Sequence, residues 1–243
     1  MRKTIFTILM ISLAMSAGAQ SLKVSYEETA NIENQLKNVT DPEIRKRVSE
    51  HLSRPALFTL YYTNGASAYV EDKPGADHEQ ISMNDKKITR LEIGRDGGVT
   101  YKSQADKVYL RETNLLGKQF LITDQLSPIN WKLTNETKKI GSYEARKATA
   151  AVNNETITAW YTPEIAVSDG PADYYGLPGL IIQLSSEKKM YNALKVTNEK
   201  ADYNLIRPSN GKVVSKAEYL HIRDEKINEL RNGNGNSLNT ARP

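Results

Sequence analysis

WYTPEIAVSDGPADYYGLPGLIIQL, residues 160–184, is the stretch that decides the fold, because no other part of the chain constrains the backbone so strongly. It places three prolines and three glycines between two apolar runs. Proline fixes φ and removes an amide hydrogen, whereas glycine tolerates positive φ. We therefore predict a strand that leaves its sheet, crosses a rigid loop and returns at Leu180–Leu184. Such a loop either plugs a core or walls a binding site.

The centre of the stretch predicts a tight turn. Pro178-Gly179 is the pair favoured in the middle of a type II turn. Leu177 and Leu180 flank this pair, so both side chains are expected to fold inward.

The rest of the chain is mainly β in pattern. Strand-like runs recur about every ten residues, which indicates one antiparallel meander. They lie at 22–26, 57–62, 67–70, 88–93, 99–102, 108–112, 118–122, 131–133, 139–143, 144–150, 156–161, 180–184 and 190–197. Residues 71–85 are expected to form a long surface loop. We predict a single β-rich domain over 20–231, with a curved sheet or open half-barrel.

Two short helices are predicted, one near each end. The first begins after Thr40 or Asp41, which can cap it, and ends before Pro55. The second begins with Ser215 and Glu218, which have the spacing of a capping box. It is expected to end at Asn232-Gly233.

The chain ends predict export and a tail. Residues 1–19 contain Arg2 and Lys3, an apolar run and a small-residue site at 17–19, which together are typical of a cleaved signal peptide. No later apolar run is long enough for a transmembrane helix. Residues 232–243 are polar and rich in Gly and Asn, so we expect a flexible tail.

The composition excludes several classes of site. The chain has no cysteine, so disulfides, thiolate metal sites and cysteine nucleophiles are excluded. Without residues 1–19 it carries 31 basic and 29 acidic residues, interspersed along the sequence. A nucleic-acid-binding protein would cluster its basic residues, so we expect no nucleic-acid partner.

The glycine- and proline-rich residues resemble the signature of the GLPGLI family, which comprises exported proteins of Gram-negative bacteria. The motif is Gly176, Leu177, Pro178, Gly179, Leu180 and Ile181, flanked by Trp160, Tyr161, Pro163, Glu164, Gly170 and Pro171. The resemblance runs from about Phe58 to Tyr219. It implies no catalytic role for any motif residue. Many members have a cysteine near Ala145, which this chain lacks, so thiol chemistry does not carry over. The predicted architecture is also similar to half-barrel carriers of the periplasm that shelter a lipid chain.

Tyrosine and tryptophan provide the candidate ligand contacts. Aromatic side chains gathered in a concavity could contact an apolar ligand, although each one alone is more often core. The candidates are Tyr61, Tyr109, Trp131, Trp160 and Tyr175.

Catalytic candidates are sparse. Glu164 and Asp173 flank the motif, and two carboxylates can perform acid–base work if they lie close together. His51, His78 and His221 lack the spacing of a helical metal site, so we expect no metal and no cofactor.

These observations lead to three functional hypotheses. The first is a non-enzymatic exported protein that binds an apolar small molecule or an envelope protein partner. The second is a hydrolase or metal-dependent enzyme that uses Glu164, Asp173 or a histidine. The third is a structural or envelope-assembly protein that recruits a partner through a free sheet edge.

Overall fold

The computed structural model describes residues 21–37, 40–52, 55–72, 80–83, 86–89, 98–153, 155–199, 203–205 and 207–236. The predicted signal peptide and residues 237–243 of the predicted tail lie outside these ranges.

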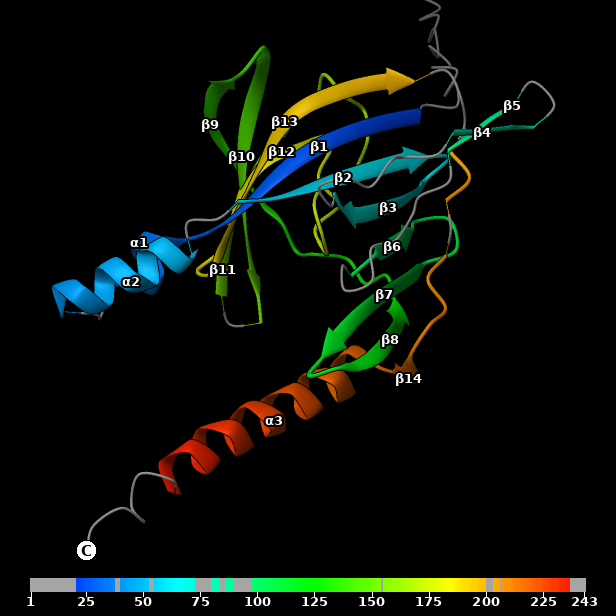
Figure 1. Cartoon of the computed structure of the whole chain (residues 1–243). Coiled ribbons are helices and arrows are strands. Elements are labelled where there is room, and N and C mark those ends of the chain that lie inside the picture. The colour runs from blue at the N-terminus through cyan, green and yellow to red at the C-terminus, as the bar shows by residue number, and fades with distance from the viewer. Residues whose placement is uncertain are drawn as a thin grey trace, which may run out of the picture.

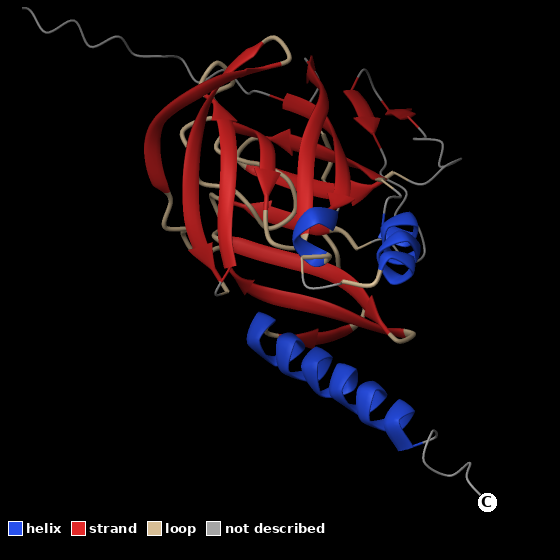
Figure 2. Ribbon diagram, turned by 90° about the vertical axis from the view of Figure 1, so that its left-hand side faces the viewer, coloured by secondary structure: helices blue, strands red, loops and turns tan. Residues whose placement is uncertain are grey.

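Twelve strands of the described chain form one curved sheet (Figures 1 and 2). Across the sheet they run β14 (Lys212–Val214), β8 (Lys118–Gln125), β7 (Val108–Leu115), β6 (Thr100–Ser103), β3 (Ala66–Glu71), β2 (Ala56–Thr63), β1 (Ser21–Ala30), β13 (Lys189–Glu199), β12 (Leu180–Ser185), β11 (Glu155–Thr162), β10 (Tyr143–Val152) and β9 (Lys132–Ile140). All pairs are antiparallel except β14 with β8. The predicted mainly β, curved architecture is thus confirmed, with one parallel strand added.

The strands follow two meanders rather than one. The chain starts in the middle of the sheet at β1, runs outward through β8, and then crosses to the far edge at β9. From there it returns strand by strand until β13 pairs with β1. The first strand therefore joins the two meanders along its whole length.

The crossing from β8 to β9 requires the sheet to curl. Residues 126–131 make this link, and a chain of that length spans at most about 25 Å. In a flat sheet the two strands would lie ten spacings of about 4.8 Å apart, or about 48 Å. The sheet must therefore bend until its two edges approach each other, without closing.

Strand register separates a concave face from an outer face. Tyr62, Ser67, Lys102 and Tyr109 lie opposite one another on successive strands. Side chains alternate along each strand, so Tyr61 belongs to the other face. There Tyr203 and Leu205 cover Tyr61 as part of a small apolar cluster.

Residues 163–179, which we call the plug, connect β11 to β12 and pack against the concave face of the sheet. Ile165 and Val167 of the plug pack in one cluster with Val24 and Tyr26 of β1. The Tyr26 hydroxyl donates to the Ile181 carbonyl at 2.5 Å, where the plug re-enters the sheet. The plug thus supplies much of the apolar core that packs against the concave face of the twelve-stranded sheet.

The helices lie at the rims of the sheet. α1 (Ile32–Gln35) and α2 (Pro42–Leu52) connect β1 to β2, and α3 (Lys216–Asn236) follows β14. The Asp41 carboxylate accepts from the Glu43 amide at 2.8 Å, which confirms the predicted cap of α2. Tyr219 of α3 packs edge-on against Phe120 of β8, and the helix then extends away from the sheet (Figure 1).

Three local predictions differ from the structure, and a fourth is only partly tested. β9 is one continuous strand, although its polar middle predicted a turn between two strands. β4 (Gln80–Met83) lies inside the predicted loop 71–85 and pairs with β5 (Lys86–Thr89). The later part of the predicted strand 88–93 lies outside the described residues. α3 continues to Asn236, four residues past its predicted end and into the predicted tail.

The turn in the hexapeptide is tighter than the predicted type II turn. The Gly179 amide donates to the Leu177 carbonyl at 2.8 Å, which closes a three-residue turn around Pro178. The Leu180 amide instead donates to the Ile165 carbonyl at 3.1 Å. Leu177 and Leu180 are both buried, as predicted.

Gly179 is required at its position for two physical reasons. Its φ is +149°, which side-chain-bearing residues rarely adopt. A Cβ atom there would also overlap the backbone carbonyl of Thr162, which belongs to a paired strand and cannot yield easily.

We predict that Gly179→Ala lowers the free energy of unfolding by about 2–5 kcal/mol, since strain and overpacking add. Gly141→Ala is the matched control, because Gly141 also has positive φ but nothing lies within 4 Å of its added Cβ. The control should cost only about 1–2 kcal/mol. Equal losses for the two variants in urea denaturation would contradict the close approach of Gly179 to Thr162.

Candidate functional site

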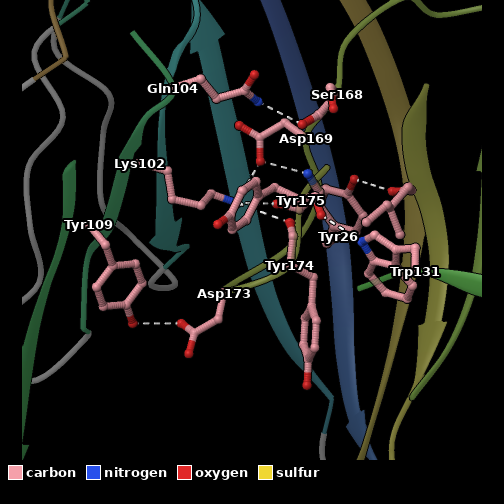
Figure 3. A network of polar contacts seen from close by, with 12 residues as sticks. Tyr26, Lys102, Gln104, Tyr109, Trp131, Ser168, Asp169, Asp173, Tyr174 and Tyr175 are labelled. Atoms are coloured by element: carbon pink, nitrogen blue, oxygen red, sulfur yellow. Dashed lines mark hydrogen bonds and ion pairs between the residues drawn. The ribbon is translucent and has the colours of Figure 1, made fainter. Parts of the chain in front are cut away.

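Asp173 of the plug is the centre of the candidate site. Tyr109 of β7 donates its hydroxyl to Oδ1 at 2.7 Å (Figure 3). Lys216, at the start of α3, donates to Oδ2 at 3.0 Å. The Arg111 guanidinium lies 3.6 Å from Oδ1. One carboxylate thus connects the plug to a strand and to the C-terminal helix.

These partners keep Asp173 ionised. Burial alone would raise the pKa of the Asp173 carboxyl, but the charges of Arg111 and Lys216 and the hydrogen bonds from Tyr109 and Lys216 outweigh it. The net result is a pKa below the ordinary value for aspartate. Asp173 is therefore a fixed negative charge at neutral pH.

The neighbouring tyrosines are held protonated. Burial, followed by the charge of Asp173, raises the pKa of Tyr109 far above its ordinary value. The same two causes, in the same order, raise the pKa of Tyr174 to about 12. Both phenols are therefore hydrogen-bond donors throughout the physiological range.

Two cavities of about 320 Å³ each meet at Asp173 and Tyr174. The first, which we call the mouth cavity, lies at the β8-to-β9 link and is also lined by Ser127, Pro128 and Tyr175. The second, which we call the inner cavity, lies over β3, β6 and β7 and is also lined by Tyr69, Arg111 and Tyr191. The plug tip therefore divides a larger concavity into two chambers.

A buried ion pair anchors the plug to the sheet. Lys102 Nζ lies 2.5 Å from Asp169 Oδ1, and the two side chains are only 1% and 3% exposed. The same ammonium donates to the Gly170 carbonyl at 2.8 Å and to the Tyr174 carbonyl at 3.2 Å (Figure 3). All three ammonium hydrogens thus have acceptors on the plug.

Further contacts hold the other side of the plug. The Trp131 indole donates to the Tyr175 carbonyl at 2.8 Å, and the Tyr175 hydroxyl donates to the Ser127 carbonyl. Gln104 of the loop after β6 donates to the Ser168 carbonyl at 2.7 Å. The plug is therefore bound both to the sheet and to the β8-to-β9 link.

The six motif residues lie at the base of the plug. Leu177, Gly179, Leu180 and Ile181 are buried, whereas Gly176 and Pro178 are exposed. Among the flanking residues, Tyr161, Gly170 and Pro171 are buried, Trp160 is half-buried, and Pro163 and Glu164 are exposed. The motif builds the loop that carries Asp173, and none of its side chains contacts that carboxylate among the described residues.

The structure brings together some of the five aromatic candidates. Tyr109 and Tyr175 both line the mouth cavity, and Trp131 supports Tyr175. Tyr61 lies on the outer face against Tyr203, with ring centroids 5.1 Å apart. Trp160 is half-buried beneath the Lys138 ammonium, 4.1 Å from its ring centroid. Register places Tyr61 away from the cavity.

The candidate acid–base residues are not brought together. Glu164 is exposed and accepts from the Glu144 amide at 2.8 Å, whereas Asp173 contacts Tyr109, Arg111 and Lys216. His221 is exposed on α3 beside Glu225. The side chains of His51 and His78 lie outside the described residues.

Two features are absent from the described residues. They contain no group of three or more His, Asp or Glu side chains that could hold a metal ion. Within the same part of the chain, no helix is long and apolar enough to cross a membrane.

Sequence reasoning missed Lys102, Arg111 and Lys216. Lys102 and Arg111 each stand on a strand whose alternation places them on the concave face, but alternation alone does not say which face is concave. The partners of all three belong to the plug, which is distant in sequence.

Comparisons with known proteins agree with the fold. A family described as "Protein of unknown function (Porph_ging)" matches residues 150–183, which cover β11, the plug and the start of β12. The structure of PNGF-II in a C2 crystal form is similar with a TM-score of 0.53 and 18% identity over 84% of this chain. A P21 form of PNGF-II gives a TM-score of 0.54 at the same identity and coverage. This chain spans about a third of the PNGF-II chain, with 33% covered. At this identity the likeness concerns the fold alone. No curated protein sequence matches the chain.

We predict that Lys102→Met lowers the free energy of unfolding by about 3–5 kcal/mol, because Asp169 would be left buried without its counter-charge. Lys226→Met is the control, since Lys226 pairs with Glu229 at the surface and should contribute less than about 1 kcal/mol. The double variant Lys102→Met/Asp169→Asn should be more stable than Lys102→Met alone. If it is less stable, the ion pair is not the source of the loss.

We also predict a pH signature for Asp173→Asn, measured as the difference in unfolding free energy from the wild type. The folded-state pKa of Asp173 is lowered, so its stabilisation is complete above the unfolded pKa of about 3.9 and fades as the pH falls through the folded value. The difference should therefore be the same at pH 7 and pH 5 and smaller at pH 3. A difference that grows as the pH falls from 7 to 5 would indicate a raised pKa instead.

Proposed function

We propose that this chain is an exported, non-enzymatic binding protein that holds a small molecule on the concave face of its sheet. The observation that carries the proposal is the pair of cavities that meet at Asp173 and Tyr174. Ligand sites are concave and combine aromatic walls with a few fixed polar groups. Export rests on residues 1–19, which have the pattern of a signal peptide.

The lining favours a ligand with both apolar and charged parts. Phe58, Tyr69 and Tyr191 provide aromatic walls in the inner cavity, but Glu28, Arg111 and Lys189 share the same chamber. A purely apolar ligand would leave these charges desolvated without new partners, which is unfavourable. The apolar ligand of the first hypothesis is therefore replaced by an amphipathic one.

The protonation states support binding over catalysis. A general acid or base works best with a pKa near the operating pH. The pKa of Asp173 is lowered and that of Tyr109 is raised, so neither group exchanges protons readily near neutrality. Glu164, the second carboxylate of the enzyme hypothesis, contacts Glu144 instead of this site.

Partner recruitment through a sheet edge has weaker support. β9 is an edge strand, and its exposed side chains include Lys132, Lys138 and Lys139. Lysines on an edge are a common device that discourages pairing with another strand.

The proposal predicts that Thr113→Trp, which adds a large side chain within the inner cavity, prevents ligand retention. The measurement is mass spectrometry of small molecules that remain bound when tagged protein is purified from the envelope of its native host. The wild type should retain a ligand in stoichiometric amount.

Thr123→Trp is the matched control, because Thr123 is exposed on the neighbouring strand β8 and pairs with Leu110 on the outer face. It should retain the ligand like the wild type. A wild-type protein that purifies empty, or equal retention by Thr113→Trp, would refute the proposal.

A further inference from the structure

We propose that the inner cavity binds a short peptide of two or three residues with a free amino end and a free carboxyl end. This inference rests on the proposed function and names the ligand class of one of its two chambers. Its basis is one uncompensated negative charge and one uncompensated positive charge at two different places on the cavity wall.

Glu71 provides the negative place. It stands on β3 two residues after Tyr69, so both face the concave side, and both line the inner cavity. Glu28, the next carboxylate in the cavity, forms an ion pair with Lys189. Glu71 has no ion-pair partner in the described part of the chain. A ligand ammonium group beside it would neutralise its charge.

Arg111 provides the positive place. Asp173 is contacted by two cations, Arg111 and Lys216, so this cluster retains one positive charge. Arg111 is the cation that lines the inner cavity, and its side chain is 40% exposed. A guanidinium presents five donors in a planar fork that matches a carboxylate. Its contacts with Asp173, at 3.6 Å, and with the Tyr109 hydroxyl leave other donors of that fork for a ligand.

The separation of the two places fits a short peptide. Tyr69 lies opposite Thr100, and Thr100 lies opposite Arg111, so Tyr69 and Arg111 are two strand spacings apart. With the two-residue step from Tyr69 to Glu71, the Cα atoms of Glu71 and Arg111 lie about 12 Å apart. Their side chains converge on the concave side, which shortens the distance between the charges. An extended tripeptide spans about 10 Å, whereas the two charges of one amino acid are too close together.

Aromatic rings line the same cavity as Glu71 and Arg111. Phe58 and Tyr69 stack with centroids 4.9 Å apart, and Tyr174 and Tyr191 meet edge-on at 6.0 Å. The Tyr69 side chain is 2% exposed, and its hydroxyl has no hydrogen-bond partner among the described residues. Burial, followed by the nearby charge of Glu28, raises the pKa of this phenol, so it stays protonated. Apolar side chains of the peptide would contact the exposed parts of these rings.

The test is affinity selection of peptide libraries by the purified protein. One library contains di- and tripeptides with free ends, the second is N-acetylated and the third is C-amidated. Bound peptides are identified by mass spectrometry, and the tightest is measured by calorimetry. We expect selection only from the first library, with about 10- to 100-fold weaker binding when either end is capped.

Two variants assign the two ends of the peptide. Glu71→Gln should abolish the preference for a free amino end and keep the preference for a free carboxylate. Arg111→Gln should abolish the preference for a free carboxylate and keep the preference for a free amino end. Glu187→Gln, at an exposed turn, is the control and should change neither preference.

Equal binding of capped and free peptides, or no binding from any library, would overturn the inference. If the wild type still retained a native ligand and Thr113→Trp did not, the proposed binding function would stand without the peptide inference. The two proposals can therefore fail separately.

Discussion

The buried ion pair between Lys102 and Asp169 is the interaction on which the site depends. Taking an ammonium and a carboxylate out of water costs several kcal/mol per ion unless each finds close partners. Here the ammonium has three acceptors, and all of them belong to the plug. The plug therefore has one position in which this lysine is satisfied. Asp173 lies only four residues after Asp169, so the same anchor also sets the place of the candidate site.

The curled sheet and the plug depend on each other. A twelve-stranded sheet without a second layer would expose its inner face to water. The short link from β8 to β9 bends the sheet, and the plug fills the concavity with Ile165 and Val167. The plug leaves part of the concavity open, and this open part forms the two cavities beside Asp173 and Tyr174. The glycine- and proline-rich stretch can therefore have both a structural and a binding role. Its base completes the core, and its tip forms part of the wall of both cavities.

The electrostatics of the cavities suit recognition. Asp173 and its neighbours Tyr109 and Arg111 keep fixed protonation states, because the pKa of each is moved away from neutrality. Neighbouring charges and hydrogen bonds do this for Asp173 and Arg111 against the effect of burial, whereas burial itself does it for Tyr109. Groups of this kind present a constant pattern of donors and acceptors to a ligand. The pattern is bipolar along the inner cavity, with Glu71 on one side and the Arg111 cluster on the other.

Local features of the fold could be predicted from residue order. Asp41 caps α2 through a side-chain bond to a neighbouring amide, and Asn64-Gly65 adopts the positive φ angles of a tight turn. β9 escaped prediction because its polar residues are nearly all exposed and carry no apolar alternation. The turn at Pro178 is tighter than its residues suggest, because the Leu180 amide is taken by Ile165 of the plug.

The sequence by itself determined most of the strands, the exclusion of cysteine chemistry and the rigid stretch at 160–184. Only the tertiary structure decided which side chains meet. Tyr61 and Tyr69 stand on the neighbouring strands β2 and β3. Register nevertheless places Tyr61 against Tyr203 on the outer face and Tyr69 in the wall of the inner cavity. Lys102 finds Asp169, and Arg111 finds Asp173, across long stretches of chain. Local sequence specifies backbone conformation through short-range sterics and hydrogen bonds, whereas a buried charge pair exists only after the sheet has curled around the plug.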